Sequence, residues 1–294
     1  MRKTSWGAYQ WLVPMLLFLF VIELWPFLVM LDQSVHYLSY TQPTKNGAFI
    51  GLDNYRKAVH DDDLFHSVSV TLLYMLIALP IEFLLGLALA VLISSHMILK
   101  RIVMPLLLIP MILAPVVVGL VARLNLNADF GLLGIMLREL GIAPEGMLGT
   151  PLNAFITIIA VDVWQWTPFL IMIFLAAILG MPREPFEAAL VEGAGRWQIF
   201  RRIMLPLLGP VMGVALLLRL TDAFKIFDQV FIMTGGGPGV ATELLTIFAY
   251  KVNFVYWNLG YGSAVVSLLF FISFVLTFVL MKLTARLGGG VVAR

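Results

Sequence analysis

Apolar residues gather in six long stretches along the chain, and most polar residues lie between these stretches. A helix needs about 20 apolar residues to cross the hydrocarbon core of a bilayer. The stretches reach about this length and lack the short alternating segments of a membrane barrel. The pattern therefore predicts an all-α membrane protein with six transmembrane helices, roughly at residues 11–31, 68–94, 102–121, 153–179, 207–233 and 262–285.

Several polar and imino residues interrupt these stretches. Prolines inside a helix remove a backbone hydrogen bond and can kink or break it, although membrane bundles tolerate them. Five prolines have such positions: Pro26, Pro80, Pro110, Pro115 and Pro168. The fifth stretch is the least regular, because its second half contains four ionisable residues, namely Arg219, Asp222, Lys225 and Asp228.

Composition agrees with a membrane location. Hydrophobic residues make up 61% of the chain and charged residues 12%, about half the charged fraction of a soluble domain. The net charge of +2 is too small to indicate nucleic-acid binding, and no basic run interleaved with aromatic residues occurs. The absence of cysteine excludes disulfides and thiolate metal sites, and the four histidines lack the spacing of metal ligands. We therefore predict no metal site and no bound cofactor in this chain.

Lysine and arginine residues predict which side of the membrane each loop faces, because cytoplasmic loops carry more of them. With the N-terminus inside, the loops that face the cytoplasm hold the larger share, beginning with Arg2 and Lys3. Both termini and the loop 180–206 are then cytoplasmic, and residues 1–294 form a single transmembrane domain. The external residues 61–63 are all aspartates, which suit the N-terminus of the second span. A calcium site is the alternative, but consecutive carboxylates lack the alternating spacing of calcium loops.

The 180–206 loop differs from the other connections, because its residues favour two short helices. Helix formers run from Glu187 to Val191, and Gly193 and Gly195 then allow the chain to turn. A second helix is expected over residues 196–204, with apolar side chains along one face. A short helix of this kind suits a groove in another protein. By these residues alone a connector at the lipid surface is the favoured interpretation.

The sequence of this loop resembles the signature loop of permeases in binding-protein-dependent ABC importers. That signature is Glu-Ala-Ala, three residues, Gly and, nine residues later, Ile-x-Leu-Pro. The matching residues here are Glu187, Ala188, Ala189, Gly193, Ile203, Leu205 and Pro206, and Ala194 and Phe200 also fit. Glu192 stands where the family often has Asp, which preserves the charge.

The resemblance covers most of the chain and points to the carbohydrate branch of these permeases, which includes the maltose and glycerol-phosphate permeases. It is carried by FIGLDNYRKAV (49–59), VWQWTPFLIMIFLAAILGMP (163–182), FDQVFIMTGGGPGVATELLTIFAYKVNF (227–254) and LGYGSAVVSLLFF (259–271). It implies the type I ABC importer permease fold, a multi-pass location in the bacterial inner membrane, and import of a sugar, polyol or glycoside.

The resemblance also implies partners. The first helix of the 180–206 loop is then a coupling helix that inserts into an ATPase subunit. The expected assembly contains a second homologous permease, an ATPase dimer that binds ATP and magnesium, and a periplasmic or lipid-anchored solute-binding protein. This chain is then a transport subunit and not an enzyme, and it contacts lipid but no nucleic acid.

Ionisable residues inside a membrane span are energetically expensive and are therefore candidates for a functional role. Arg219, Asp222 and Lys225 are three residues apart, so on a helix they could neutralise one another as a ladder. Such a ladder could be a buried ion-pair network or could lie beside the solute path, whereas Glu23 and Glu82 look isolated. A carbohydrate also needs aromatic faces and hydrogen-bonding groups, although tryptophans equally suit an interfacial belt. The candidate solute path comprises Asp162, Trp164, Gln165, Trp166, Arg219, Asp222, Lys225 and Asp228.

Two other classes of protein remain as alternatives. A secondary transporter driven by an ion gradient could use the embedded charges, but it predicts an internal inverted repeat that the sequence does not show. An intramembrane enzyme is not supported, because HExxH and GxSxG patterns are absent. The glycine-rich residues 234–239 lack the Lys-Ser/Thr of a phosphate-binding loop. We expect them to form an external turn that contacts the solute-binding protein.

Overall fold

The computed structural model of this protein is mostly helical and describes residues 6–95 and 97–288, with side chains for residues 12–95 and 104–282. Arg2 and Lys3, which the orientation argument uses, lie outside the described residues. Within the described part, five helices are long and apolar enough to cross a membrane, or six if one bent pair counts as a single span. The all-helical prediction for the spans is therefore confirmed, and the number of spans is five or six.

The chain forms two compact units. The first runs to Phe65 and includes residues 248–272, and the second comprises residues 66–247 and those from 273 onward. Elements of the first unit are α1 (Trp6–Leu19), η1 (Phe20–Leu24), α2 (Trp25–Ser34), β1 (His36–Tyr37), η2 (Pro43–Lys45), β2 (Ala48–Phe49), α3 (Asp53–Ala58) and η4 (Lys251–Val255). Elements of the second unit are α5 (Met97–Ile112), α6 (Pro115–Asn125), α7 (Leu132–Glu139), α8 (Pro151–Leu179), α9 (Glu184–Val191), α10 (Arg196–Ile199), η3 (Phe200–Met204), α11 (Leu205–Phe224) and α12 (Asp228–Met233). The boundary falls within α4 (Asp62–Ser94), α13 (Leu245–Tyr250) and α14 (Leu259–Gly288).

The first helical run, α1 to α2, is apolar on all sides. Its side chains from Leu12 to Trp25 are exposed within the described chain, which suits a helix surrounded by lipid. A π turn, η1, precedes Pro26, and the amide of Trp25 donates to the carbonyl of Phe20. Proline cannot donate the next helical hydrogen bond, and the wider turn lets the helix continue.

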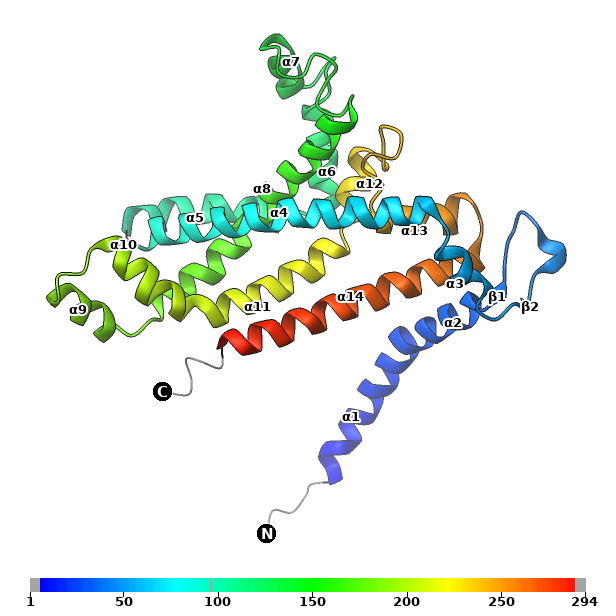
Figure 1. The fold of residues 1–294 in the computed structure, drawn as a ribbon, viewed down its shortest axis with the longest axis horizontal. Coiled ribbons are helices and arrows are strands. Elements are labelled where there is room, and N and C mark those ends of the chain that lie inside the picture. Colours follow the sequence, from blue (N-terminus) through cyan, green and yellow to red (C-terminus); the bar gives the residue numbers. More distant parts are fainter. Residues whose placement is uncertain (1–5, 96, 289–294) are drawn as a thin grey trace. The chain divides into compact units, whose positions relative to one another are not determined.

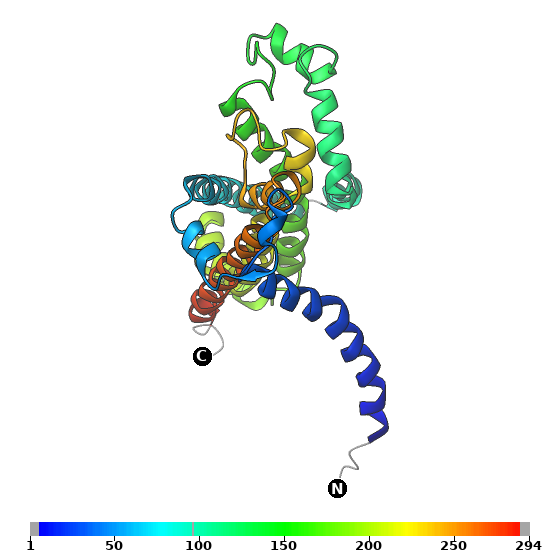
Figure 2. The ribbon, with the colours of Figure 1, turned by 90° about the vertical axis from the view of Figure 1, so that its right-hand side faces the viewer.

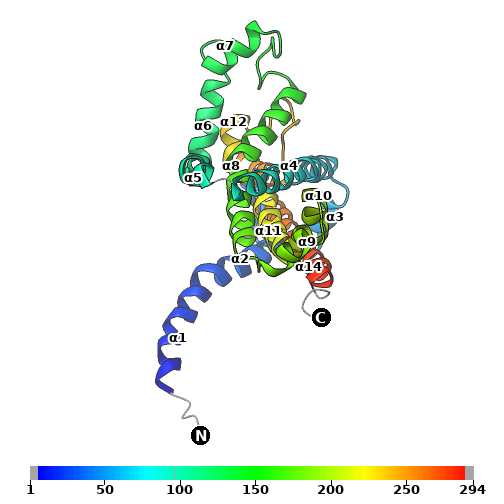
Figure 3. The ribbon, with the colours of Figure 1, turned by 90° about the vertical axis from the view of Figure 1, so that its left-hand side faces the viewer.

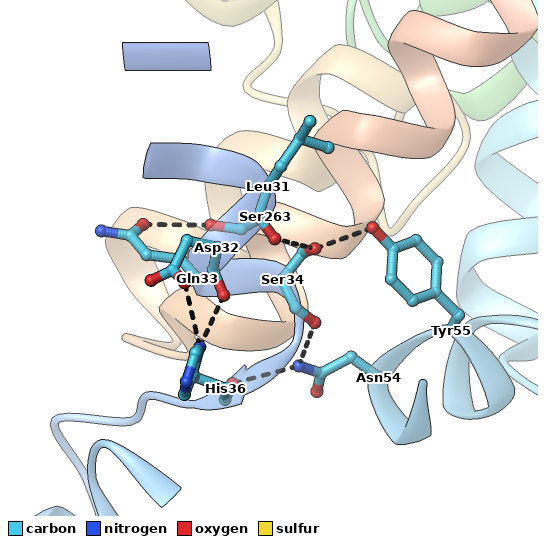
Figure 4. Close-up of polar contacts among 8 residues, drawn as sticks. All are labelled: Leu31, Asp32, Gln33, Ser34, His36, Asn54, Tyr55 and Ser263. Atoms are coloured by element: carbon cyan, nitrogen blue, oxygen red, sulfur yellow. Dashed lines mark hydrogen bonds and ion pairs between the residues drawn. The ribbon is translucent and has the colours of Figure 1, made fainter. Parts of the chain in front are cut away.

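The outer segment FIGLDNYRKAV joins three elements of the first unit through two side chains (Figure 4). Asn54 on α3 donates hydrogen bonds to the backbone oxygens of Ser34, at 2.8 Å, and His36, at 3.2 Å. The hydroxyl of Tyr55 pairs with the Ser34 hydroxyl at 2.7 Å and with the Ser267 hydroxyl on α14 at 2.9 Å. The segment contains one short helix, α3. Its role is to tie the end of α2 and the small β1–β2 ribbon to α14.

Two glycines of the LGYGS segment permit close packing at the start of α14. A Cβ atom on Gly260 would lie 2.4 Å from the carbonyl oxygen of His36. A Cβ atom on Gly262 would lie 2.3 Å from Oδ1 of Asn253. Real Cβ atoms do not approach other atoms so closely. Gly260 faces backbone and therefore requires glycine, whereas at Gly262 the side chain of Asn253 would have to move.

The aspartates before the second span mark the beginning of α4, as predicted. Asp61 is the capping residue, since its Oδ1 accepts hydrogen bonds from the amides of Asp63, at 3.0 Å, and Leu64, at 3.2 Å. Its other oxygen accepts from the hydroxyl of Tyr261. Asp61 therefore satisfies helix amides and a tyrosine with its two oxygens, which gives the first aspartate of the run a structural role.

The second unit is built on α4, α8 and α11, which share an apolar core. Its fully buried members include Ile93 on α4, Leu170 and Phe174 on α8, and Ala215 on α11. Gly86 on α4 faces Leu170, and a Cβ atom there would lie 2.8 Å from Cβ of Leu170. The predicted second and fourth spans are confirmed as α4 and α8, which remain helical through Pro80 and Pro168.

The predicted third span, 102–121, is not one straight helix. It consists of α5 and α6, which meet at an angle of 98° at Leu113 and Ala114. Figures 2 and 3 show α5 nearly end-on with α6 rising from it. Pro110 lies in the last turn of α5 and Pro115 begins α6. Two prolines so close together remove successive helical hydrogen bonds, which explains the break.

The predicted fifth span, 207–233, is also interrupted. Helix α11 ends at Phe224, and a short second helix, α12, begins at Asp228. Figure 1 shows α12 at one end of α11 and the α9–α10 turn at the other end. Residues 234–239 form the expected turn, with positive φ at Gly235, Gly236 and Gly239. The Gly-rich segment after α6 contains a helix, α7, which the sequence did not predict.

Candidate functional site

The 180–206 loop contains two short helices separated by a glycine turn, as predicted. The first, α9, ends in a Schellman motif, in which the amide of Gly193 donates to the carbonyl of Leu190 and the amide of Ala194 to that of Ala189. Gly193 has φ of +78°, a conformation that residues with a Cβ atom rarely adopt. The side chain of Gln198 then accepts a hydrogen bond from the amide of Gly195 at 3.0 Å and fixes the start of α10.

This loop exposes large apolar side chains among its charged residues. Val191 is 89% exposed, and Trp197, whose ring stacks on that of Phe200, is 68% exposed. Residues of the signature pattern divide between surface and interior. Exposed members are Glu187, Ala188, Glu192, Gly193 and Pro206, half-buried members are Ala194, Phe200, Ile203 and Leu205, and Ala189 is buried. Apart from Pro206, the exposed members lie on α9 or directly after it, where another protein could approach.

The second helix of the loop continues directly into α11. The π turn η3 links α10 to α11 without a break, so the helix passes Pro206. The amide of Leu205 donates to the carbonyl of Phe200, one residue further back than in an α-helix. As at Pro26, the widened turn accommodates a proline that has no amide hydrogen.

A buried cluster of charges lies at the centre of the second unit and joins α4, α8 and α11. The guanidinium of Arg219 donates to both carboxylate oxygens of Glu82, from Nε at 2.6 Å and from Nη2 at 2.8 Å. Nη2 also donates to Oδ2 of Asp162, which in addition accepts a hydrogen bond from the hydroxyl of Tyr74. All four side chains are at most 1% exposed. Bidentate pairing of this kind is the geometry in which arginine tolerates burial.

The ladder predicted from the spacing of Arg219, Asp222 and Lys225 is wrong. Among the described residues, the ion pairs of Arg219 are with Glu82 and Asp162. Helix α11 ends at Phe224, so Lys225 lies beyond it, and both Asp222 and Lys225 are exposed. The sequence contains a general signal for a carboxylate partner such as Glu82, since an arginine inside a span needs one. It gave none for Tyr74.

A pocket of about 330 Å³ lies where α8, α11 and α12 meet. Its lining includes most of the predicted solute-path residues, namely Asp162, Trp166, Arg219, Asp222, Lys225 and Asp228, together with Gln229. The ring of Trp166 lies 5.2 Å from Cζ of Arg219. Asp162 Oδ1 and Gln229 Oε1 are buried and have no hydrogen-bond partner within the described part of the chain. The pocket therefore offers an aromatic face, charges of both signs and unused acceptors.

The other two predicted residues have different environments. Gln165 is fully buried, and its Nε2 donates to the carbonyl of Leu113 at 3.0 Å, while its Oε1 accepts from Gln229. Gln165 thus donates a hydrogen bond to the Leu113 carbonyl, which lies at the break between α5 and α6. Trp164 is 53% exposed and lines an apolar pocket together with residues such as Val121 and Leu133. The structure places Trp164 away from the charged pocket, in the environment of a lipid-facing aromatic residue.

Comparison with known proteins identifies the class. Residues 82–288 match the family described as binding-protein-dependent transport system inner membrane component. The trehalose/maltose transport system permease protein MalF of Thermococcus litoralis is 34% identical over 237 residues, covering 80% of this chain and 79% of the relative. The chain belongs to this family of ABC importer permeases, as its 180–206 loop predicted, and it is therefore a transport subunit of the multi-pass inner-membrane type.

Two solved structures share the fold. They are a bacterial ABC transporter involved in the import of the acidic polysaccharide alginate, and a bacterial alginate ABC transporter in complex with an alginate pentasaccharide-bound periplasmic protein. Their matching chains superpose with a TM-score of 0.82 and cover 97% of this chain and 96% of their own, at 20% and 21% identity. The structure of this chain is therefore that of an ABC importer permease over nearly its whole length.

Proposed function

We propose that this chain forms half of the translocation pathway of an ATP-driven importer for a sugar, polyol or glycoside. The observation that carries the proposal is the 180–206 loop, whose exposed signature residues and positive-φ Gly193 form a docking helix in a family of transport subunits. The solute class is supported by a relative, since MalF of Thermococcus litoralis is a trehalose/maltose transport permease.

The proposed assembly follows the type I importer plan. The α5–α6 pair counts as one bent span, which gives six spans in a single domain, with both termini and the 180–206 loop in the cytoplasm of a bacterium. A second homologous permease completes the pathway. Two ATPase subunits bind ATP and magnesium, and a solute-binding protein delivers the solute from outside; the alginate complex with a periplasmic protein supports this last partner.

In this proposal the first helix of the loop transmits the movement of the ATPases. Residues Glu187 to Gly193 insert into an ATPase cleft, and Trp197 and Val191 supply exposed apolar contacts. Closure of the ATPases on ATP then reorients the permease pair, so that its cavity opens alternately to the two sides of the membrane. The pocket bordered by Asp162, Trp166 and Arg219 is the part of the solute path that this chain supplies.

Gly193→Asp tests the coupling role. The change places a side chain and a charge at a position with φ of +78° and with no atom within 4 Å in the chain itself, so the fold of the isolated permease has room for it. Gly141→Asp is the matched control, because Gly141 has φ of +71° and is equally open but lies outside the loop. Both variants carry the same backbone strain, about 1–2 kcal/mol.

The measurement is ATPase co-purification with the tagged permease, followed by solute uptake in reconstituted vesicles. We expect Gly193→Asp to lose both, while Gly141→Asp retains both. Normal uptake and normal ATPase recovery with Gly193→Asp would overturn the coupling role of this helix. Equal losses in the two variants would show that backbone strain, and not docking, is responsible.

A further inference from the structure

The pocket between α8, α11 and α12 has an excess of acidic side chains. Its lining contains the carboxylates of Asp162, Asp222 and Asp228 against the cations of Arg219 and Lys225. By formal charge the lining is negative. Adding Glu82, which lies behind Arg219 and pairs with it, makes the excess larger.

Arg219 is largely occupied by its own carboxylate partners. Its Nε and Nη2 are both engaged by carboxylates, and its side chain is 1% exposed. An anionic solute that bound either of these nitrogens would have to displace Glu82 or Asp162 and leave that carboxylate buried without its partner, which is strongly unfavourable. Lys225 is therefore the lining cation that remains for a ligand, and it is exposed.

The surroundings of Lys225 also disfavour an anion. It follows the last residue of α11 as the C-cap, where the free carbonyls of a helix concentrate partial negative charge. Asp222 and Asp228 line the same pocket on either side of it in the sequence, and both are exposed. A sulfate, phosphate or carboxylate group that approached Lys225 would meet these two carboxylates as well.

Two buried acceptors point to what the pocket takes instead. Oδ1 of Asp162 and Oε1 of Gln229 belong to side chains that are 0% and 1% exposed, and neither atom has a partner within the described residues. A buried acceptor without a donor is unfavourable. A ligand hydroxyl or ammonium group can supply that donor, whereas a carboxylate or sulfate cannot. Trp166, half-buried in the lining, offers an aromatic face for the apolar side of a sugar ring.

Resting on the proposed function, we infer that this pocket selects uncharged or cationic hydroxyl-bearing solutes and excludes acidic sugars. Asp162 accepts a hydroxyl hydrogen through Oδ1, Gln229 accepts a second, and Asp222 and Asp228 repel anions. In this respect the chain differs from the transporter of similar fold that imports the acidic polysaccharide alginate.

The test uses the complete membrane complex, with both permeases and the ATPases, in lipid nanodiscs. The solute-binding protein is left out, so that its own selectivity does not decide the result. Binding is followed by thermal stabilisation of the complex with maltose, trehalose, the cationic disaccharide of glucosamine and the anionic disaccharide of galacturonate. We expect at least one neutral or cationic sugar to bind about tenfold or more tightly than the galacturonate disaccharide.

Variants separate this inference from the proposed function. The double variant Asp222→Asn/Asp228→Asn removes two lining charges at exposed positions. It should reduce the ratio of affinities for the preferred sugar and the acidic sugar several-fold. Asp162→Asn should weaken binding of the preferred sugar about tenfold. Equal or tighter binding of the galacturonate disaccharide by the wild type, or an unchanged preference in the double variant, overturns the inference alone. Failure of every sugar to bind a complex that still recovers its ATPases overturns both the inference and the sugar assignment of the proposed function.

Discussion

Arg219 on α11 and Glu82 on α4 are joined by two hydrogen bonds, of 2.6 and 2.8 Å, although 137 residues separate them in the sequence. Both side chains are buried, so water and salt do not screen this ion pair as they screen ion pairs at a surface. The same guanidinium also reaches Asp162 on α8. One cation therefore holds three helices of the second unit together.

Removing this cation should be more damaging than removing one of its carboxylates. Arg219→Gln leaves Glu82 and Asp162 buried without a positive partner, and breaking a buried pair in this way costs about 3–5 kcal/mol. Glu82→Gln keeps an acceptor for Arg219 and lowers the excess of negative charge in the cluster, so the expected loss is about 1–3 kcal/mol. Thermal unfolding of the purified variants in detergent measures both. Equal losses would show that the cluster is held by packing and not by its charge.

The buried amide of Gln165 should stabilise the break between α5 and α6. Gln165→Leu removes the donor of the 3.0 Å hydrogen bond to the Leu113 carbonyl. It also removes the oxygen that accepts a hydrogen bond from Nε2 of Gln229. We expect a loss of about 1–3 kcal/mol in unfolding free energy. Trp164→Leu is the control on the neighbouring residue, which is 53% exposed and should change stability little. A larger effect of Trp164→Leu than of Gln165→Leu would contradict this assignment.

Gly260 should tolerate no side chain. Gly260→Ala places a Cβ atom 2.4 Å from the His36 carbonyl oxygen, which forces the backbones apart and should destabilise the protein by about 1–3 kcal/mol, the usual range for overpacking. Gly209→Ala is the matched control, since Gly209 lies inside α11 with no atom within 4 Å of the added carbon. That change should be neutral or stabilising by up to about 1 kcal/mol, because alanine favours helix. A melting temperature of Gly260→Ala at or above that of wild type would refute the packing argument.

Sequence reasoning worked best where the signal is local. The two short helices around Gly193 follow from helix propensity and from the need for a positive φ, and the beginning of α4 follows from Asp61. Both features depend on residues within a few positions of one another, so a single sequence contains the information. The glycine pair Gly260 and Gly262 was visible as a string, but its reason was not, because it lies in the contact with His36 and Asn253.

Sequence reasoning failed where partners are distant. The spacing of Arg219, Asp222 and Lys225 suggested mutual neutralisation, whereas Arg219 is satisfied by Glu82 and Asp162 on other helices. Periodicity within one helix cannot identify a partner across the bundle, and an isolated glutamate in an apolar run gives no direction. The extent of the bend at Leu113 was equally hidden, since a proline permits a kink without setting its angle.

The uninterrupted helix from α10 through η3 to α11 has a mechanical consequence. It begins at Arg196, beside the exposed turn of the 180–206 loop, and ends at Phe224, five residues after Arg219. At about 1.5 Å per residue such a rod is on the order of 40 Å long. A tilt of only a few degrees applied at Arg196 would therefore displace the pocket end by an ångström or more, enough to strain the short hydrogen bonds that Arg219 makes with its two carboxylates. Because the π turn lets the helix pass Pro206 without a break, the segment from Arg196 to Phe224 can move as one rigid body.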